Sequence, residues 1–150
     1  MNQLRIINRT RGTVVGSRVA LANNLWSRLR GFLGRPRPTE GEGILLVPCN
    51  AIHTFGMKFP LDVLFLDAEG QVLHMEDDFP PWKTTKRIRD ARYVLEVPAG
   101  TAAATRTQPG DDFTWMPPRS GGSAGAGTPA MRTHDQTLSS STPHEARRLS

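Results

Sequence analysis

Short apolar runs separated by turn residues occur through most of the first 116 residues, and this pattern is typical of β-strands. Residues 4–21 predict a hairpin, because two apolar runs flank the turn sequence NRTRG. Residues 61–79 predict a second hairpin around the turn DAEG, whose Gly70 tolerates a positive φ angle. Further strands are expected in GILLVP (43–48), RYVLEV (92–97) and QPGDDFTWM (108–116).

Helical periodicity occurs in residues 23–34, where leucines recur at intervals of four. Asn23 or Asn24 can cap this helix and Gly31 or Gly34 can end it, so its expected length is about two or three turns. The sequence TAAATRT is expected to add one helical turn near the C-terminal end of the domain.

Strands therefore clearly outnumber helices, and one of them has a distinctive composition. Residues 61–66 are apolar on both faces of the predicted strand except at Asp62. A strand of this kind is usually covered on both sides. The pattern predicts a mainly β fold with a minor α contribution: a compact antiparallel sandwich or a partly closed barrel, with one short helix packed on it.

The composition changes at residue 117. Residues 117–150 contain no Val, Ile, Phe, Trp or Tyr, and 18 of these 34 residues are Gly, Ser, Pro or Thr. Such a segment buries too little apolar surface to offset the entropy lost on ordering. We therefore expect a single globular domain over residues 1–116 and a disordered tail over residues 117–150. The single cysteine, Cys49, excludes an internal disulfide framework.

The formal net charge of +5 comes largely from two basic clusters that lie beside aromatic residues. The clusters are Arg28, Arg30, Arg35 and Arg37, and then Lys83, Lys86, Arg87, Arg89 and Arg92. No nucleic-acid-binding motif accompanies them, and charge runs usually face solvent, so we expect no nucleic-acid partner.

No apolar stretch approaches the roughly 18 residues of a membrane span. The first residues, MNQLRIINRTRG, lack the apolar run of a signal peptide. We therefore expect a cytoplasmic protein without a membrane span, although an upstream start codon would add an N-terminal segment that could carry an export signal.

Four segments occur in an order that resembles a known family. They are LWSRLRGFLGR (25–35), GILLVPCNAIHTFGMKFPLDVLFLDAEGQVL (43–73), YVLEVPAG (93–100) and PGDDF (109–113). Over roughly residues 14–116 the chain resembles the bacterial and archaeal family called domain of unknown function 192. The resemblance implies a compact, mainly β domain whose biochemical activity is not established.

The recurring elements of that family match three groups of residues in this chain. They are Arg28, Gly31 and Arg35; Met57, Pro60, Leu61 and Asp62; and Leu95, Glu96, Pro98, Ala99 and Gly100. Many members have an aromatic pair, often Phe-Trp, before the central Met, whereas this chain has Phe55-Gly56 preceded by His53. The absence of that Trp weakens the hypothesis of an aromatic platform here.

Cys49, His53 and Met57 recur at intervals of four and are the ligand types that suit copper. A helix would align them, but Gly56 and Pro60 oppose a helix in this segment. The alternative is a part-buried Cys, a core Met and a surface His. We therefore expect no metal and no cofactor, and these three residues are the candidates should a soft metal bind.

Cys49, His53 and Asp62 are also the residue types of a Cys-His-Asp triad, which is recognised by geometry and not by chain order. Nothing in the sequence predicts a nucleophile elbow or a helix N-terminus at Cys49. No catalytic residue is therefore assigned, and an inert, part-buried cysteine is the simpler interpretation.

Asp62 and Glu96 each lie inside an apolar strand, where a buried carboxylate needs partners. Arginines in or after the predicted helix could supply them, and the result would be a buried ion-pair network that fixes the helix on the sheet. The alternative is a binding site for a small polar ligand, because perturbed ionisable groups cluster at such sites. The candidate residues of that site are Arg35, His53, Met57, Asp62 and Glu96.

These considerations predict a small binding or accessory domain that recognises a small polar ligand or a protein partner through the Cys49–Asp62 segment. The first alternative is an enzyme of unassigned type that uses His53 and Asp62 as acid and base. The second alternative is soft-metal (copper) binding. Whether the protein is an enzyme stays open at this point.

The sequence FPPWKTTKRIRD (79–90) predicts an exposed loop. Such a loop could clamp a ligand or partner. We expect instead an ordinary connection whose Trp82 covers the edge of the core.

Deletion of residues 117–150 should leave the melting temperature nearly unchanged, because the segment buries little apolar surface. Differential scanning calorimetry of the full and shortened chains checks this. A large drop would show that the segment docks on the domain.

Overall fold

The computed structural model describes residues 3–24 and 31–117 of the 150-residue chain. Seven strands form one sheet in the order β5-β4-β6-β3-β2-β1-β7. The strands are β1 (Gln3–Asn8), β2 (Thr13–Ala22), β3 (Glu42–Leu46), β4 (Leu61–Leu66), β5 (Val72–Phe79), β6 (Tyr93–Pro98) and β7 (Phe113–Met116). Neighbouring strands are antiparallel except β2 and β3, which are parallel and thus depart from the expected antiparallel arrangement.

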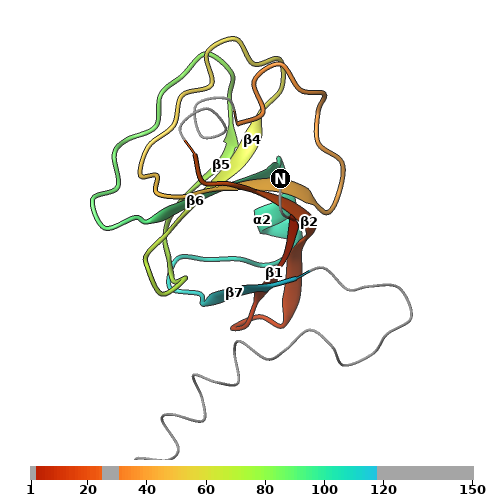
Figure 1. Ribbon diagram of the computed structural model, residues 1–150, viewed down its shortest axis with the longest axis vertical. Helices are drawn as coiled ribbons and strands as arrows, with labels where there is room; N and C mark the ends of the chain where they lie inside the picture. Colours follow the sequence, from red (N-terminus) through yellow and green to blue (C-terminus); the bar gives the residue numbers. More distant parts are fainter. Residues whose placement is uncertain (1–2, 25–30, 118–150) are drawn as a thin grey trace, which may run out of the picture. The chain divides into compact units, whose positions relative to one another are not determined.

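The sheet curls until its two edge strands approach each other. Figure 1 shows β4 and β5 at one end of the drawn sheet and β1 and β7 at the other. Gln71, just before β5, forms an antiparallel bridge with Asp112, just before β7. The Phe113 backbone N–H donates to the Gly70 carbonyl oxygen at 2.8 Å. The predicted mainly β, partly closed barrel is therefore confirmed.

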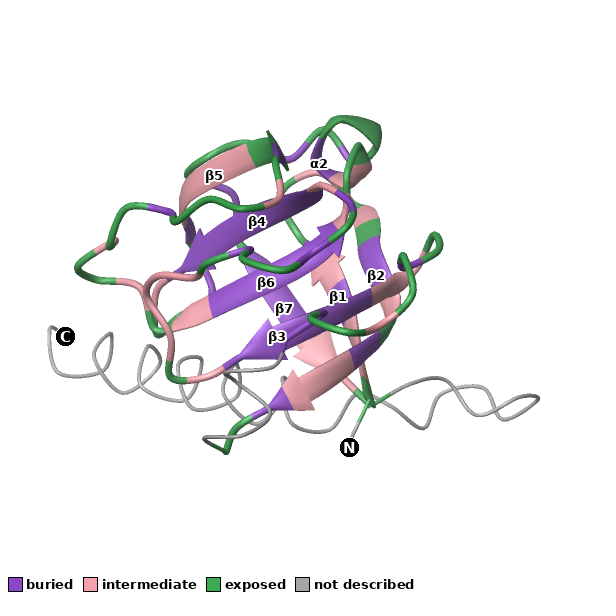
Figure 2. Cartoon of the chain, turned by 90° about the horizontal axis from the view of Figure 1, so that it is seen from above, coloured by how far each residue is buried: buried purple, intermediate pink, exposed green. Residues whose placement is uncertain are grey.

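The sheet separates two apolar layers. One layer takes residues from all seven strands, among them Ile6, Leu64 and Phe113, and therefore fills the inside of the curl. The outer layer combines residues of β2 to β6 with Phe32, Met57 and Phe59 from the connections. Strand β4 is buried at every position and β6 at all but its ends (Figure 2), as expected for a strand covered on both faces.

The side chain of Asp62, on β4, faces the inner layer, and hydrogen bonds satisfy its buried carboxylate. Its Oδ2 atom accepts hydrogen bonds from the backbone N–H groups of Gly100, at 3.1 Å, and Ala102, at 2.8 Å. Its Oδ1 atom accepts from the Asp78 N–H at 2.8 Å. Gly100 and Ala102 begin the single helix of the described residues, α2 (Thr101–Ala104). Backbone N–H groups therefore satisfy this carboxylate.

The opposite side of α2 is tied to the other end of the sheet. Thr13, on β2, donates from its hydroxyl to the Thr105 carbonyl oxygen at 3.0 Å. Asn8, on β1, donates from Nδ2 to the Thr107 hydroxyl at 3.1 Å and to the Asp111 carboxylate at 2.9 Å. The helical turn thus connects β4 with β1 and β2, and it holds the curl of the sheet.

The remaining sequence predictions have different outcomes. The helical turn expected in TAAATRT is confirmed by α2. The helix expected at 23–34 falls mostly on residues 25–30, which lie outside the described residues, and the described part of that segment begins with a turn at Gly31. The tail expected from residue 117 also lies outside them, except for Pro117. Within 3–24 and 31–117, no helix is long and apolar enough to cross a membrane.

We expect Asp62→Asn to lower the free energy of unfolding by about 2–4 kcal/mol, because an amide nitrogen would replace an oxygen that accepts buried hydrogen bonds. Urea denaturation checks this. Asp67→Asn is the matched control, since only Oδ1 of Asp67 accepts, from the N–H groups of Glu69 and Gln71 at 2.9 Å each. Asn keeps one such oxygen, so Asp67→Asn should lower the free energy of unfolding by less than about 1 kcal/mol. Equal losses in both variants would contradict the role given to Asp62.

Candidate functional site

The two strand carboxylates lie on opposite faces of the sheet. Asp62 pairs with Val97 across β4 and β6, and Val97 belongs to the inner layer. Glu96 pairs with Val63 and Ile44, both of which belong to the outer layer. Since neighbouring strand residues alternate between faces, Asp62 and Glu96 do not share one cleft.

Glu96 lies beneath the turn that begins at Gly31. The Phe32 backbone N–H donates to its carboxylate, and the charge of Arg35 also favours the ionised form. Burial outweighs both effects and raises the pKa of Glu96 to about 7. A Cβ atom at Gly31 would lie 3.0 Å from Glu96 Oε1, and Gly31 has a φ of +47°. Both the close approach and the positive φ therefore favour glycine at this position.

At this turn, two buried polar atoms have no hydrogen-bond partner among the described residues: Oε1 of Glu96, on β6, and Nε of Arg35. Glu96 as a whole is only 4% exposed. No ion pair within 4.0 Å joins the two side chains in the described chain. Arg28 and Arg30, the other arginines that could take part in an ion-pair network, lie outside the described residues. A buried polar group without a partner costs free energy, and a bound water or ion commonly completes such a group.

Arg35 also lines a pocket of about 390 Å³ between its own turn and the segment before β4. We call this the cationic pocket, and its lining residues are Phe32, Gly34, Arg35, Pro36, Arg37, Gly56, Met57, Lys58 and Phe59. Phe32, Met57 and Phe59 are buried and form its apolar part. Arg35, Arg37 and Lys58 provide three positive charges, and no carboxylate is among the described lining residues. The Arg37 guanidinium lies 5.8 Å from the centre of the Phe59 ring, within cation–π range.

Of the five predicted site residues, this region therefore brings together Arg35, Met57 and Glu96. Asp62 lies across the sheet with both oxygens occupied. His53 is exposed, its ring stacks on Phe55 at 5.1 Å between centroids, and its Nδ1 atom accepts the Phe55 N–H at 3.3 Å.

The copper candidates have separate surroundings. Cys49 is half-buried and donates from Sγ to the Ala51 carbonyl oxygen at 3.3 Å, while Met57 is buried in the outer layer. His74, the other histidine of the domain, contacts Glu76 at 2.8 Å. In residues 3–24 and 31–117, no group of three or more His, Cys, Asp or Glu side chains is arranged to hold a metal ion.

Three aromatic side chains form a feature that the sequence did not predict, and we call it the aromatic ladder: His53, Phe55 and Trp82. The Phe55 ring lies between those of His53 and Trp82. The centroids of the Phe55 and Trp82 rings are 6.3 Å apart, and their planes are inclined by 32°. Phe55 is 48% exposed and Trp82 is 67% exposed. The expectation that Trp82 covers the core was therefore wrong. Trp82 has a positive φ of 64°, which no local sequence signal indicates.

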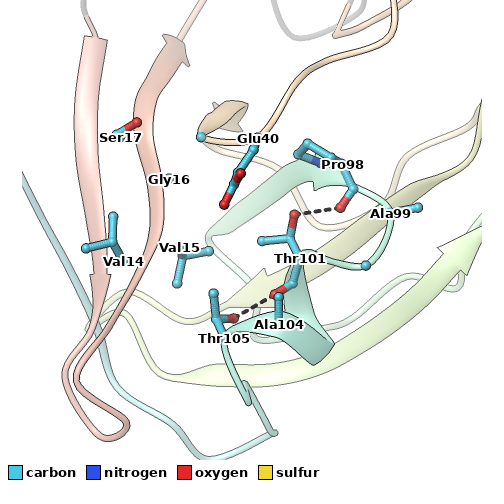
Figure 3. Close-up of a pocket in the computed structure, with 12 residues that line it drawn as sticks. Val14, Val15, Gly16, Ser17, Glu40, Pro98, Ala99, Thr101, Ala104 and Thr105 are labelled. Atoms are coloured by element: carbon cyan, nitrogen blue, oxygen red, sulfur yellow. Dashed lines mark hydrogen bonds between the residues drawn. The ribbon is translucent and has the colours of Figure 1, made fainter.

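A second pocket, of about 520 Å³, lies between β2 and the segment Pro98–Thr105 (Figure 3). Glu40 is its one charged side chain among the described lining residues. The hydroxyl of Thr101 donates to the Pro98 carbonyl oxygen at 2.7 Å, and that of Thr105 donates to the Thr101 carbonyl oxygen at 2.8 Å. Because these hydroxyls are already bonded, this pocket has less to offer a polar ligand than the cationic pocket.

Comparison with known proteins places this domain in a family. The model of the family DUF192, described as "Uncharacterized ACR", matches residues 6–115. The chain belongs to this family, as the ordered motifs indicated.

The relatives agree with this assignment. A UPF0127 protein of Thermococcus sibiricus is 29% identical over an alignment of 115 residues that covers 73% of this chain and 73% of the relative. A UPF0127 protein of Pyrococcus abyssi is 30% identical over an alignment of 117 residues that covers 74% of this chain and 97% of the relative. A crystal structure of a protein of unknown function from Novosphingobium aromaticivorans has a similar fold, with a TM-score of 0.66 and 21% identity. The superposition covers 75% of this chain and 84% of the Novosphingobium chain.

The buried Glu96 makes stability depend on pH. Its pKa of about 7 lies above its ordinary value of 4.5, so the folded state binds more protons between these values. We expect the contribution of Glu96 to the free energy of unfolding to be largest below about pH 4.5 and to fall by roughly 3 kcal/mol as the pH rises through 7. Urea denaturation at several pH values, for the natural chain and for Glu96→Gln, isolates this contribution.

Gln stays neutral and can still accept the Phe32 N–H, so the fall should be absent in Glu96→Gln. A difference between the two chains that stays constant from pH 4.5 to 8 would contradict a raised pKa at Glu96.

Proposed function

We propose that this domain is a binding domain that takes a small anionic ligand with an apolar part into the cationic pocket. The observation that carries the proposal is a pocket whose described lining residues include three cations, Arg35, Arg37 and Lys58, and no carboxylate. A carboxylate or phosphate group would complement this charge, and arginine binds such groups through two parallel hydrogen bonds.

The remaining walls of the pocket support a ligand that is only partly polar. Phe32, Met57 and Phe59 offer buried apolar surface to the rest of the molecule. A volume of about 390 Å³ suits a small ligand. Met57 is unbranched and adapts its shape to the group it contacts.

The raised pKa of Glu96 also favours an anionic ligand. With a pKa of about 7, its carboxyl group is protonated in about half of the molecules at neutral pH. A protonated Glu96 leaves the charge of Arg35 available to an anion. The buried acid thus stabilises the turn without fully neutralising the pocket.

The enzyme hypothesis has less support. His53 lies on the exposed aromatic ladder, whereas both oxygens of Asp62 accept backbone hydrogen bonds inside the sheet. An acid and a base must reach the same reacting group, and no described contact joins these two residues. Binding is therefore the function that the geometry favours.

A titration with phenyl phosphate, followed by ¹H–¹⁵N nuclear magnetic resonance, tests the proposal. The amide signals of Gly34, Gly56 and Lys58, which line the cationic pocket, should shift at the lowest concentrations. Phenol lacks the anion and inorganic phosphate lacks the ring, so both should bind more weakly. Shifts spread evenly over the exposed cations of the surface would contradict a specific pocket.

Arg35→Gln should weaken phenyl phosphate binding about tenfold to a hundredfold, the loss expected for a charge-assisted hydrogen bond. Arg18→Gln is the matched control, because Arg18 lies on β2, is half exposed and faces Glu42 at 4.0 Å. It should leave the affinity unchanged. An equal loss in both variants would show that only net charge matters.

A further inference from the structure

The aromatic ladder is an exposed apolar surface that the cationic pocket does not use. Its three rings follow one another with centroid distances of 5.1 and 6.3 Å and with planes inclined by 29° and 32°. Exposed aromatic rings are energetically unfavourable in water, and such surfaces commonly mark a binding site.

The ladder is held by a rigid support. Thr54, between His53 and Phe55, is fully buried. Its hydroxyl donates to the Pro80 carbonyl oxygen at 2.8 Å and accepts the Lys83 N–H at 3.0 Å. Its carbonyl oxygen accepts the Trp82 N–H at 2.9 Å. These bonds fix the Trp82 backbone in a left-handed conformation that a bulky residue rarely adopts. The ring is thus presented to solvent by a well-bonded loop.

The loop that carries Trp82 has mainly positive charge, and two exposed acids, Asp77 and Asp78, precede it at the end of β5. The loop 80–92 carries five exposed cations and a single acid, Asp90. The cations are Lys83, Lys86, Arg87, Arg89 and Arg92. None of them forms an ion pair with another residue of the described chain. A partner with negative charge at short intervals would match this loop.

We propose that the aromatic ladder binds single-stranded nucleic acid, whose bases stack on Phe55 and Trp82 while the cations of the loop 80–92 contact the phosphates. This combination of stacked rings and a basic surface is how proteins bind single strands without reading their sequence. A duplex hides the faces of its bases, and a neutral sugar would not need the cations. The proposal reverses the expectation drawn from the sequence, and it does not depend on the cationic pocket.

Fluorescence anisotropy with a fluorescein-labelled single-stranded DNA of about ten nucleotides tests the proposal on the full chain. Trp82→Leu and Phe55→Leu should each weaken binding about fivefold to a hundredfold, the range measured for loss of one stacked base. Val14→Ser is the control, because Val14 is an exposed apolar residue of β2 outside the ladder. It should bind like the natural chain, and all three variants should keep the natural melting temperature.

Three results would overturn the proposal. One is the absence of binding to the single strand at low salt. Another is binding that Trp82→Leu and Phe55→Leu leave unchanged, which would reflect only the general attraction of a basic protein for a polyanion. The third is equal or tighter binding of a duplex of the same sequence, or binding of a neutral oligosaccharide in place of the DNA.

Discussion

The carboxylate of Asp62 is the interaction on which the shape of the domain depends. A charge on a strand that is covered on both faces must be satisfied from within the protein. Three backbone N–H groups from two separate segments do this, at 2.8 to 3.1 Å. Because two of them begin α2, the same contact that satisfies the charge also fixes the helical turn against β4. The bonds from Thr13 and Asn8 then hold the far side of α2, and the sheet keeps its curl.

Glu96 shows the opposite solution to the same problem. It lies on the strand next to that of Asp62 but on the outer face of the sheet, where one backbone N–H and the charge of Arg35 only partly offset its burial. The incomplete set of partners leaves one oxygen of Glu96 and one nitrogen of Arg35 without a bond. Asp62 is thus satisfied by backbone N–H groups, whereas Glu96 keeps one buried oxygen without a partner in the described chain. The two residues have similar sequence contexts, and only the identity of their neighbours in space separates them.

The segment between Cys49 and Asp62 contributes residues to both the aromatic ladder and the cationic pocket. Phe55 points to solvent and joins the aromatic ladder, while Met57 and Phe59 turn inward and line the cationic pocket. Gly56, with a φ of +83°, lies between them and allows this change of direction. Trp82, from a different loop, supplies the ring that lies beside Phe55. Two segments far apart in the chain therefore build the aromatic ladder together.

The sequence by itself determined the strands, because short apolar runs and glycine-containing turns act over a few residues. It predicted both hairpins, the doubly covered strand β4, the helical turn α2 and the family. It also singled out Glu96 as a carboxylate inside an apolar strand, Arg35 as a possible partner for it, and Met57 as part of the motif that the family resemblance carries. Tertiary structure alone decided that β2 and β3 run parallel, that Asp62 and Glu96 face different layers, and that Trp82 meets Phe55. These outcomes depend on contacts between residues far apart in the chain and on backbone conformations such as the positive φ of Trp82, for which the local sequence contains no signal.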